Sequence, residues 1–79
     1  MQNLYDKLRD IEEKQSNIRP NEEVYVSIDT TYDEHFSTNI KNFWNHPEDK
    51  QVYFNNGRYI SIDYEEIKSI SCRSLYLDF

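Results

Sequence analysis

The sequence predicts an α+β fold, with an N-terminal helix followed by four to five short strands in a strongly curled antiparallel sheet or small barrel. Three observations predict this fold. Apolar residues recur at helical spacing near the N-terminus, apolar and polar residues alternate over 23–29, and Asn56-Gly57 separates two apolar runs. Since the chain has 79 residues, we expect one domain, 1–79, with the helix in 1–17 and the β-rich region in 22–79.

The first element is a helix of about three turns, the length over which the apolar spacing persists. Asn3 is a suitable N-cap, and Leu4, Leu8 and Ile11 fall on one face. We expect the helix to end near residues 15–17, because Pro20 disfavours helical backbone at the residue before it. A helix this short needs packing partners, so its apolar face should contact the strands.

The next element is a half-buried strand over 23–29. Val24, Val26 and Ile28 point to one face, and the residues between them are polar or Tyr. Residues 30–34 form a polar connection. Segment 35–46 is ambiguous, because its apolar residues also fit helical spacing; a bent strand over 36–44 is favoured, since the intervening Ser, Thr and Asn are poor helix formers.

The C-terminal half reads as a series of short strands. His46-Pro47 starts a turn, and strands at 52–54 and 59–62 form a hairpin in which Asn56-Gly57 predicts a two-residue type I′ turn. Residues 63–66 form a short 3₁₀ turn before a strand at 67–70, which continues or ends over 71–74. Residues 75–79 are apolar enough to add a last strand.

Composition excludes several classes of protein. The chain has no apolar run of the length that crosses a membrane, and its first residues lack the basic and apolar parts of a secretory signal. Cys72 is the single cysteine, which excludes a disulfide scaffold. We therefore expect a cytoplasmic protein without membrane contact. Abundant Asn, Ile, Lys, Tyr and Phe, with no Ala, are typical of AT-rich genomes and give weak support to a microbial or phage origin.

No pattern in the sequence predicts an enzyme, a metal site or a cofactor. Nothing in the spacing of His35, His46 and Cys72 places them in one cleft with an orienting group, as a Cys/His hydrolase requires. The acidic clusters lack the frame of a calcium-binding loop. Gly57 is the single glycine, so no phosphate-binding glycine pattern exists.

Charge is the most informative feature. The net charge is −6, and residues 20–40 contain five carboxylates without one Lys or Arg. Carboxylates can accept bidentate contacts from Arg, as phosphates do, and Tyr rings bury large area at low entropic cost. We expect an acidic, Tyr-containing face that mimics DNA and binds a basic protein surface, formed by Glu22, Glu23, Asp29, Tyr32, Asp33 and Glu34. Solubility alone remains an alternative explanation of these charges.

Aromatic residues offer a second binding chemistry. Eight rings could stack on the bases of a single-stranded nucleic acid, namely Tyr25, Tyr32, Phe36, Phe43, Trp44, Tyr53, Tyr59 and Tyr64. Neighbouring Asp and Glu would repel the phosphates, so we expect no direct contact with nucleic acid. The simpler interpretation is that Tyr25, Tyr53 and Tyr59 cover the outer face of a sheet.

Two motifs resemble the YolD-like family. They are Asn21-Glu22-Glu23-Val24-Tyr25-Val26 and the segment 58–70, RYISIDYEEIKSI, and the likeness covers about 4–71. The resemblance implies a helix followed by a strand-rich Sm/SH3-like barrel, and a protein-binding role near DNA repair and error-prone polymerases, with no catalytic residues. The chain departs from the family in lacking a basic N-terminal extension and a Gly-rich central strand.

Three functions follow. The first is a non-enzymatic inhibitor or modulator of a nucleic-acid-binding enzyme, of the phage or mobile-element anti-defence type, such as an anti-CRISPR protein. The second is a YolD-like accessory protein of a repair polymerase. The third is a self-associating structural module, in which Phe43, Trp44 and Phe79 are buried in a homodimer.

Overall fold

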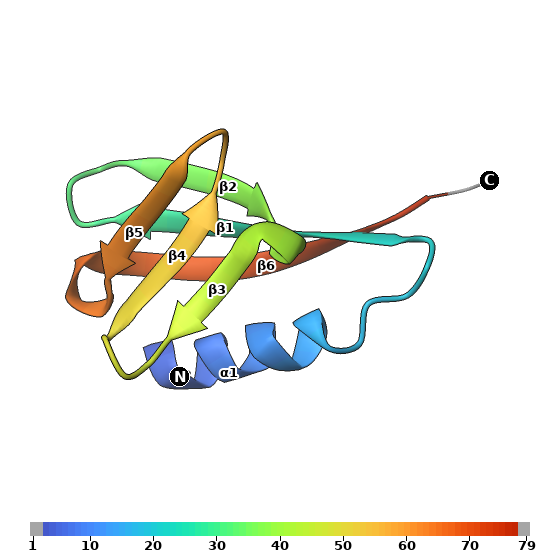
Figure 1. Ribbon diagram of the computed structural model, residues 1–79, viewed down its shortest axis with the longest axis horizontal. Helices are drawn as coiled ribbons and strands as arrows, with labels where there is room; N and C mark the ends of the chain where they lie inside the picture. The colour runs from blue at the N-terminus through green and yellow to red at the C-terminus, as the bar shows by residue number, and fades with distance from the viewer. Residues whose placement is uncertain (1–2, 78–79) are drawn as a thin grey trace.

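The computed structural model describes residues 3–77, which form one helix and six strands (Figure 1). The elements in chain order are α1 (Leu4–Gln15), β1 (Glu22–Thr30), β2 (His35–Asn39), the 3₁₀ turn η1 (Ile40–Asn42), β3 (Phe43–His46), β4 (Gln51–Asn55), β5 (Tyr59–Asp63), the 3₁₀ turn η2 (Tyr64–Glu66) and β6 (Ile67–Tyr76). The predicted α+β class, with a leading helix and an antiparallel β-rich region, is confirmed.

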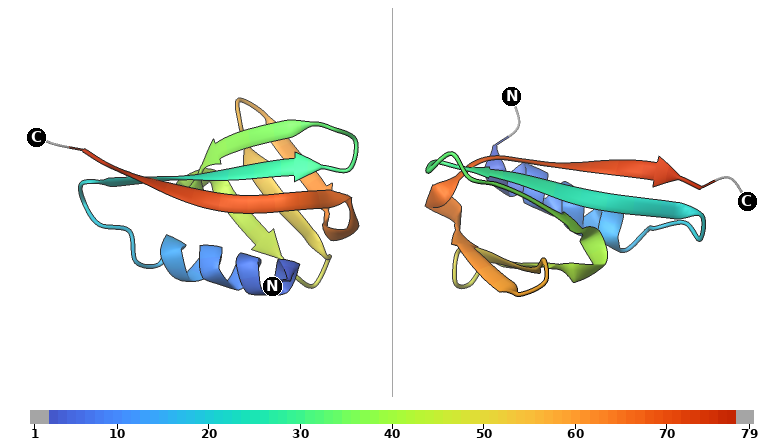
Figure 2. Two further views of the ribbon diagram at one scale, coloured as in Figure 1. Left: turned by 180° about the vertical axis from the view of Figure 1, so that it is seen from behind. Right: turned by 90° about the horizontal axis from the view of Figure 1, so that it is seen from above.

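The strands form two antiparallel three-stranded sheets, with orders β2-β1-β6 and β3-β4-β5. Their strands cross at an angle, and the helix runs beneath them beside β6 (Figures 1 and 2). The inward faces of both sheets and one face of the helix share a single core. Its fully buried side chains come from every layer: Leu8, Ile11, Val24, Val26, Ile28, Ile40, Phe43, Val52 and Phe54.

The helix begins as predicted. The Asn3 side chain accepts a hydrogen bond of 2.9 Å from the Asp6 N–H, which satisfies one of the free donors of the first turn. Leu8 and Ile11 are buried on the predicted face. At the other end, Gln15 Nε2 donates to the Ile40 and Phe43 carbonyls, each at 2.8 Å, so the last helical residue is fastened to the entry of β3.

The ambiguous segment 35–46 is mostly strand, as favoured, but it is interrupted by η1. The Asn39 side chain caps this turn by accepting from the Lys41 N–H at 3.0 Å, and Ile40 is fully buried. The turn redirects the chain from the first sheet to the second, so β2 and β3 belong to different sheets.

The expected single curled sheet or barrel of four to five strands is wrong in strand number and closure. Two open sheets form instead, because η1 and η2 interrupt the chain at both crossings and no strand is shared between the sheets. The predicted 3₁₀ turn at 63–66 is confirmed as η2. No helix within 3–77 is long and apolar enough to span a bilayer.

Two predictions about turns and ends also need correction. Asn55 pairs with Tyr59, so the hairpin loop contains three residues, and within it only Gly57 has a positive φ, of 87°. A two-residue type I′ turn would require two such residues. The strand predicted at 67–70 continues without a break to Tyr76, and residues 78–79 of the predicted last strand lie outside the described residues.

Candidate partner-binding surface

The turn between β1 and β2 is organised by a buried threonine. Thr30 is 2% exposed, and its hydroxyl accepts from the N–H groups of Tyr32 and Glu34 at 3.3 and 3.2 Å. The Thr30 N–H also donates to the Glu34 carbonyl at 2.9 Å. Asp33 sits at the tip with φ of 61°, a backbone conformation that Asp tolerates better than most residues. These bonds hold the backbone, so the side chains of 32–34 project outward.

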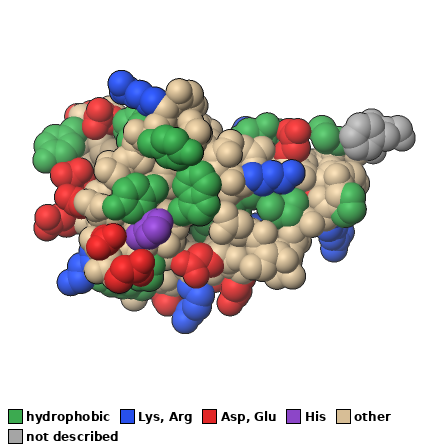
Figure 3. Space-filling view, viewed as in Figure 1, with side chains coloured by type: hydrophobic (Ala, Val, Ile, Leu, Met, Phe, Trp, Pro, Cys, Tyr) green, Lys and Arg blue, Asp and Glu red, His purple; other side chains and the backbone are tan. Residues whose placement is uncertain are grey.

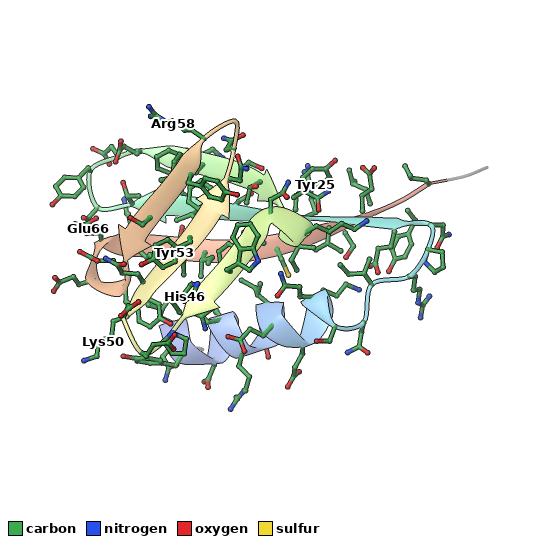
Figure 4. The ribbon with its side chains drawn as sticks, viewed as in Figure 1. Tyr25, His46, Lys50, Tyr53, Arg58 and Glu66 are labelled. Carbon is green, nitrogen blue, oxygen red and sulfur yellow. The ribbon has the colours of Figure 1, made fainter. Side chains whose placement is uncertain are left out.

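A second acidic segment lies beside this turn. The Thr31 N–H donates to the Glu66 carbonyl at 2.9 Å, which fastens η2 to the β1–β2 turn. We call the surface formed by Tyr32, Asp33, Glu34 and Glu66 the acidic end. Tyr32 is 68% exposed, and carboxylates gather at this end of the molecule (Figures 3 and 4). Sequence reasoning missed Glu66 because the two segments are joined only in three dimensions.

Asp29 lies next to the acidic end on the outer face of the first sheet. Its Oδ1 is 2.7 Å from His35 Nδ1, and its Oδ2 accepts from the Ser69 hydroxyl at 3.0 Å. These two contacts hold the pKa of the Asp29 carboxyl below its ordinary value of 3.8. Asp29, Asp33 and Glu34 line an open groove of about 340 Å³ together with Lys68.

Glu22 does not belong to this surface, contrary to the expectation of one shared exposed face. Its side chain is fully buried, and Oε2 lies 2.6 Å from the Lys14 ammonium. That ion pair lowers the pKa of Glu22 from 4.5 to about 2. Burial of the carboxylate acts in the opposite direction, and a hydrogen bond from the Arg19 N–H lowers the pKa further. Glu22 alternates in phase with the buried valines of β1, which explains its inward direction.

Glu23 is also remote from the acidic end. The Tyr25 hydroxyl donates to its Oε2 at 2.8 Å on the outer face of the first sheet. At a strand rise of about 3.3 Å per residue, the β1 positions of Glu22 and Glu23 lie roughly 20 Å from Asp29. Of the six predicted residues, the structure therefore brings together Asp29, Tyr32, Asp33 and Glu34.

The predicted aromatic platform is divided between different environments. Phe43 is buried at 1% exposure, so it can neither stack on a base nor join a homodimer, while Phe79 lies outside the described residues. Tyr25 lies on the outer face of the first sheet, and Tyr53 and Tyr59 lie on that of the second. This agrees with the simpler interpretation that these tyrosines cover sheet surfaces.

Four aromatic side chains do gather on the outer face of the second sheet: three of the predicted platform, Trp44, Tyr53 and Tyr59, and His46, which sequence reasoning did not include. The ring centroids of Trp44 and Tyr59 are 6.3 Å apart, and those of His46 and Tyr53 are 4.6 Å apart in an edge-to-face arrangement. Hydrophobic side chains lie beside the histidine over β3–β5 (Figures 3 and 4). Alternation within 52–54 and 59–62 was the signal that could have located this surface.

The residues considered for catalysis are not assembled. His35, His46 and Cys72 belong to β2, β3 and β6. In the His35, Asp29 and Ser69 row the carboxylate lies between the other two groups, whereas a catalytic triad needs the histidine in the middle. Within 3–77 no group of three His, Cys, Asp or Glu side chains is placed to hold a metal ion. Cys72 is exposed.

Comparison with known proteins finds no matching family model, curated protein or solved structure. The resemblance to the YolD-like family therefore stays a prediction.

Proposed function

We propose that this protein is a non-enzymatic binding protein whose acidic end occupies a basic, nucleic-acid-binding surface of another protein and so inhibits or modulates it. One observation carries the proposal: the backbones of two acidic segments, the β1–β2 turn and η2, are joined at one end of the molecule by the hydrogen bond from the Thr31 N–H to the Glu66 carbonyl. The exposed ring of Tyr32 stands among them and supplies an anchor of large area.

The local chemistry favours a protein partner over a nucleic acid. Asp33, Glu34 and Glu66 form no ion pair with any residue in 3–77, so their carboxylates are available to external cations. Carboxylates accept the same bidentate contacts from Arg that phosphates accept, and they repel phosphates themselves. A phage or mobile-element anti-defence protein of the anti-CRISPR type would act in this way.

The test compares two variants with equal loss of charge. The tagged protein is expressed in bacterial cells, cross-linked and captured, and the co-purifying proteins are identified. The first variant neutralises the acidic end with substitutions that suit the local backbone: Asp33→Asn, Glu34→Gln and Glu66→Gln. The second neutralises three exposed carboxylates elsewhere: Asp10→Asn, Glu13→Gln and Asp49→Asn.

We expect the wild type and the second variant to capture a nucleic-acid-binding protein, and the first variant to lose it. Added duplex DNA should release the partner, because both would compete for one basic surface. Binding should weaken steeply between low and high salt. Equal capture by the two variants, or a partner that DNA does not displace, would refute the proposal.

A further inference from the structure

A second, chemically different site lies away from the acidic end, in the groove between the C-terminal half of α1 and the free edge of β3. The groove has a volume of about 470 Å³. Glu12 and Gln15 line it from the helix, and Trp44, His46 and Pro47 line it from β3 and the following turn. Trp44 is 40% exposed, so a large part of its indole ring is in contact with solvent.

The carboxylate of this groove is held in place. Glu12 Oε1 accepts from Asn45 Nδ2 at 2.5 Å, and the other end of the Asn45 amide accepts from the buried Tyr64 hydroxyl. No hydrogen bond from residues 3–77 reaches Glu12 Oε2. The wall of the groove therefore offers an oriented carboxylate with one unused oxygen, in the groove that Trp44 also lines.

The surrounding charges favour a cation. No Lys or Arg lines the groove, and a second carboxylate, that of Glu48, lies 3.5 Å from Nδ1 of His46, which lines the groove. The indole of Trp44 is packed against the ring of Tyr59, with ring planes at 33°, and this contact supports its position. Aromatic faces attract cations, most strongly when the ring is a Trp.

We propose that this groove binds the guanidinium group of an arginine side chain on a partner protein. The planar guanidinium stacks on Trp44 and donates to Glu12 Oε2, which combines the two contacts that distinguish Arg from the compact ammonium of Lys. A nucleobase is a poorer occupant, because the attached phosphates would meet Glu12 and Glu48. The proposal goes beyond the proposed function, since it concerns a different surface and its test requires no identified partner.

The single tryptophan makes the test direct. The indole Nε1–H resonance of Trp44 is followed by ¹H–¹⁵N NMR while N-acetyl-arginine amide is added. N-acetyl-citrulline amide has nearly the same shape without the charge, and N-acetyl-lysine amide has the charge without the plane. We expect a saturable shift with the arginine compound, a weaker one with the lysine compound, and none with the citrulline compound.

Two variants then test whether the Glu12 carboxylate binds the arginine compound. Glu12→Gln keeps the acceptor for Asn45 and removes the charge, so arginine affinity should fall about tenfold, as expected for one charge-assisted contact. Glu13→Gln, one residue further on the exposed helix surface, should leave the affinity unchanged. Preserved dispersion of the amide spectrum confirms that each variant is folded.

Several results of these titrations would overturn the proposal that the groove binds arginine. An equal response to citrulline, an unchanged affinity in Glu12→Gln, or no shift at all would overturn the proposal. A shift produced by a short oligothymidine and not by the arginine compound would also overturn it and indicate a nucleic-acid surface. The triple variant of the acidic end should bind arginine normally, so failure of this proposal is distinguishable from failure of the proposed function.

Discussion

The junction between α1 and the second sheet gives the sharpest stability prediction. Gln15 Nε2 donates two hydrogen bonds of 2.8 Å, to the carbonyls of Ile40 and Phe43, whose side chains are 0% and 1% exposed. Gln15→Met keeps the length of the side chain but removes both donors. Each net hydrogen bond contributes about 0.5–1.5 kcal/mol, so the variant should lose about 1–3 kcal/mol.

Urea and thermal unfolding followed by circular dichroism measure this loss. In a domain of this size each kcal/mol shifts Tm by about 4–8 °C, so we expect a decrease of roughly 4–24 °C with an unchanged urea m-value. Glu13→Met is the matched control, because it places the same side chain on the exposed helix surface. A Gln15→Met midpoint equal to that of the control would refute the view that these bonds fasten the helix.

Three further predictions concern the turns and the ion pairs. Gly57→Ala should lower the free energy of unfolding by about 1 kcal/mol, because the φ of Gly57 is 87°, which strains an L-residue. No atom lies within 4 Å of an added Cβ, so backbone strain is the sole penalty, and a D-Ala at this position should leave the free energy of unfolding unchanged. Lys14→Met should raise the pKa of Glu22 well above about 2, because the contact that opposes the effect of burial most strongly is then removed, and carboxyl NMR titration would detect this; an unmoved pKa contradicts it. Since the pKa of Asp29 is lowered on folding, its ionised form stabilises the protein above about pH 3.8 and this contribution is lost as the pH falls further. Asp29→Asn should therefore lower Tm at pH 6 and have a progressively smaller effect as the pH falls below about 3.8, and a constant difference would exclude the linkage.

Local elements were predictable because their signals are local. Helical spacing located α1, and alternation located β1 with its buried valines. The same alternation assigns Glu22 to the buried face of β1, in phase with Val24, so its absence from the acidic surface could have been inferred. Its pairing with Lys14 could not, because it depends on how the end of the helix meets the start of β1.

The division into two sheets was not predictable from these patterns. Ile40 continues the apolar spacing of its neighbours, and nothing in its sequence context distinguishes a bent strand from a strand interrupted by a 3₁₀ turn. The interruption depends on tertiary contacts, such as the Gln15 bonds on either side of it. The acidic end could not be predicted for the same reason, because Glu66 contacts Thr31 only once the chain has passed from the first sheet to the second and back.

The position of β1 between β2 and β6 has a consequence for biosynthesis. β1 is the central strand of its sheet, yet one neighbour, β2, follows immediately and the other, β6, follows only after the β3–β5 meander. During translation the meander emerges early enough to assemble from contacts close in sequence, whereas one edge of β1 stays open until β6 has left the ribosome. Ribosome-stalled chains that lack β6 should therefore be degraded by proteases along β1 while the meander resists.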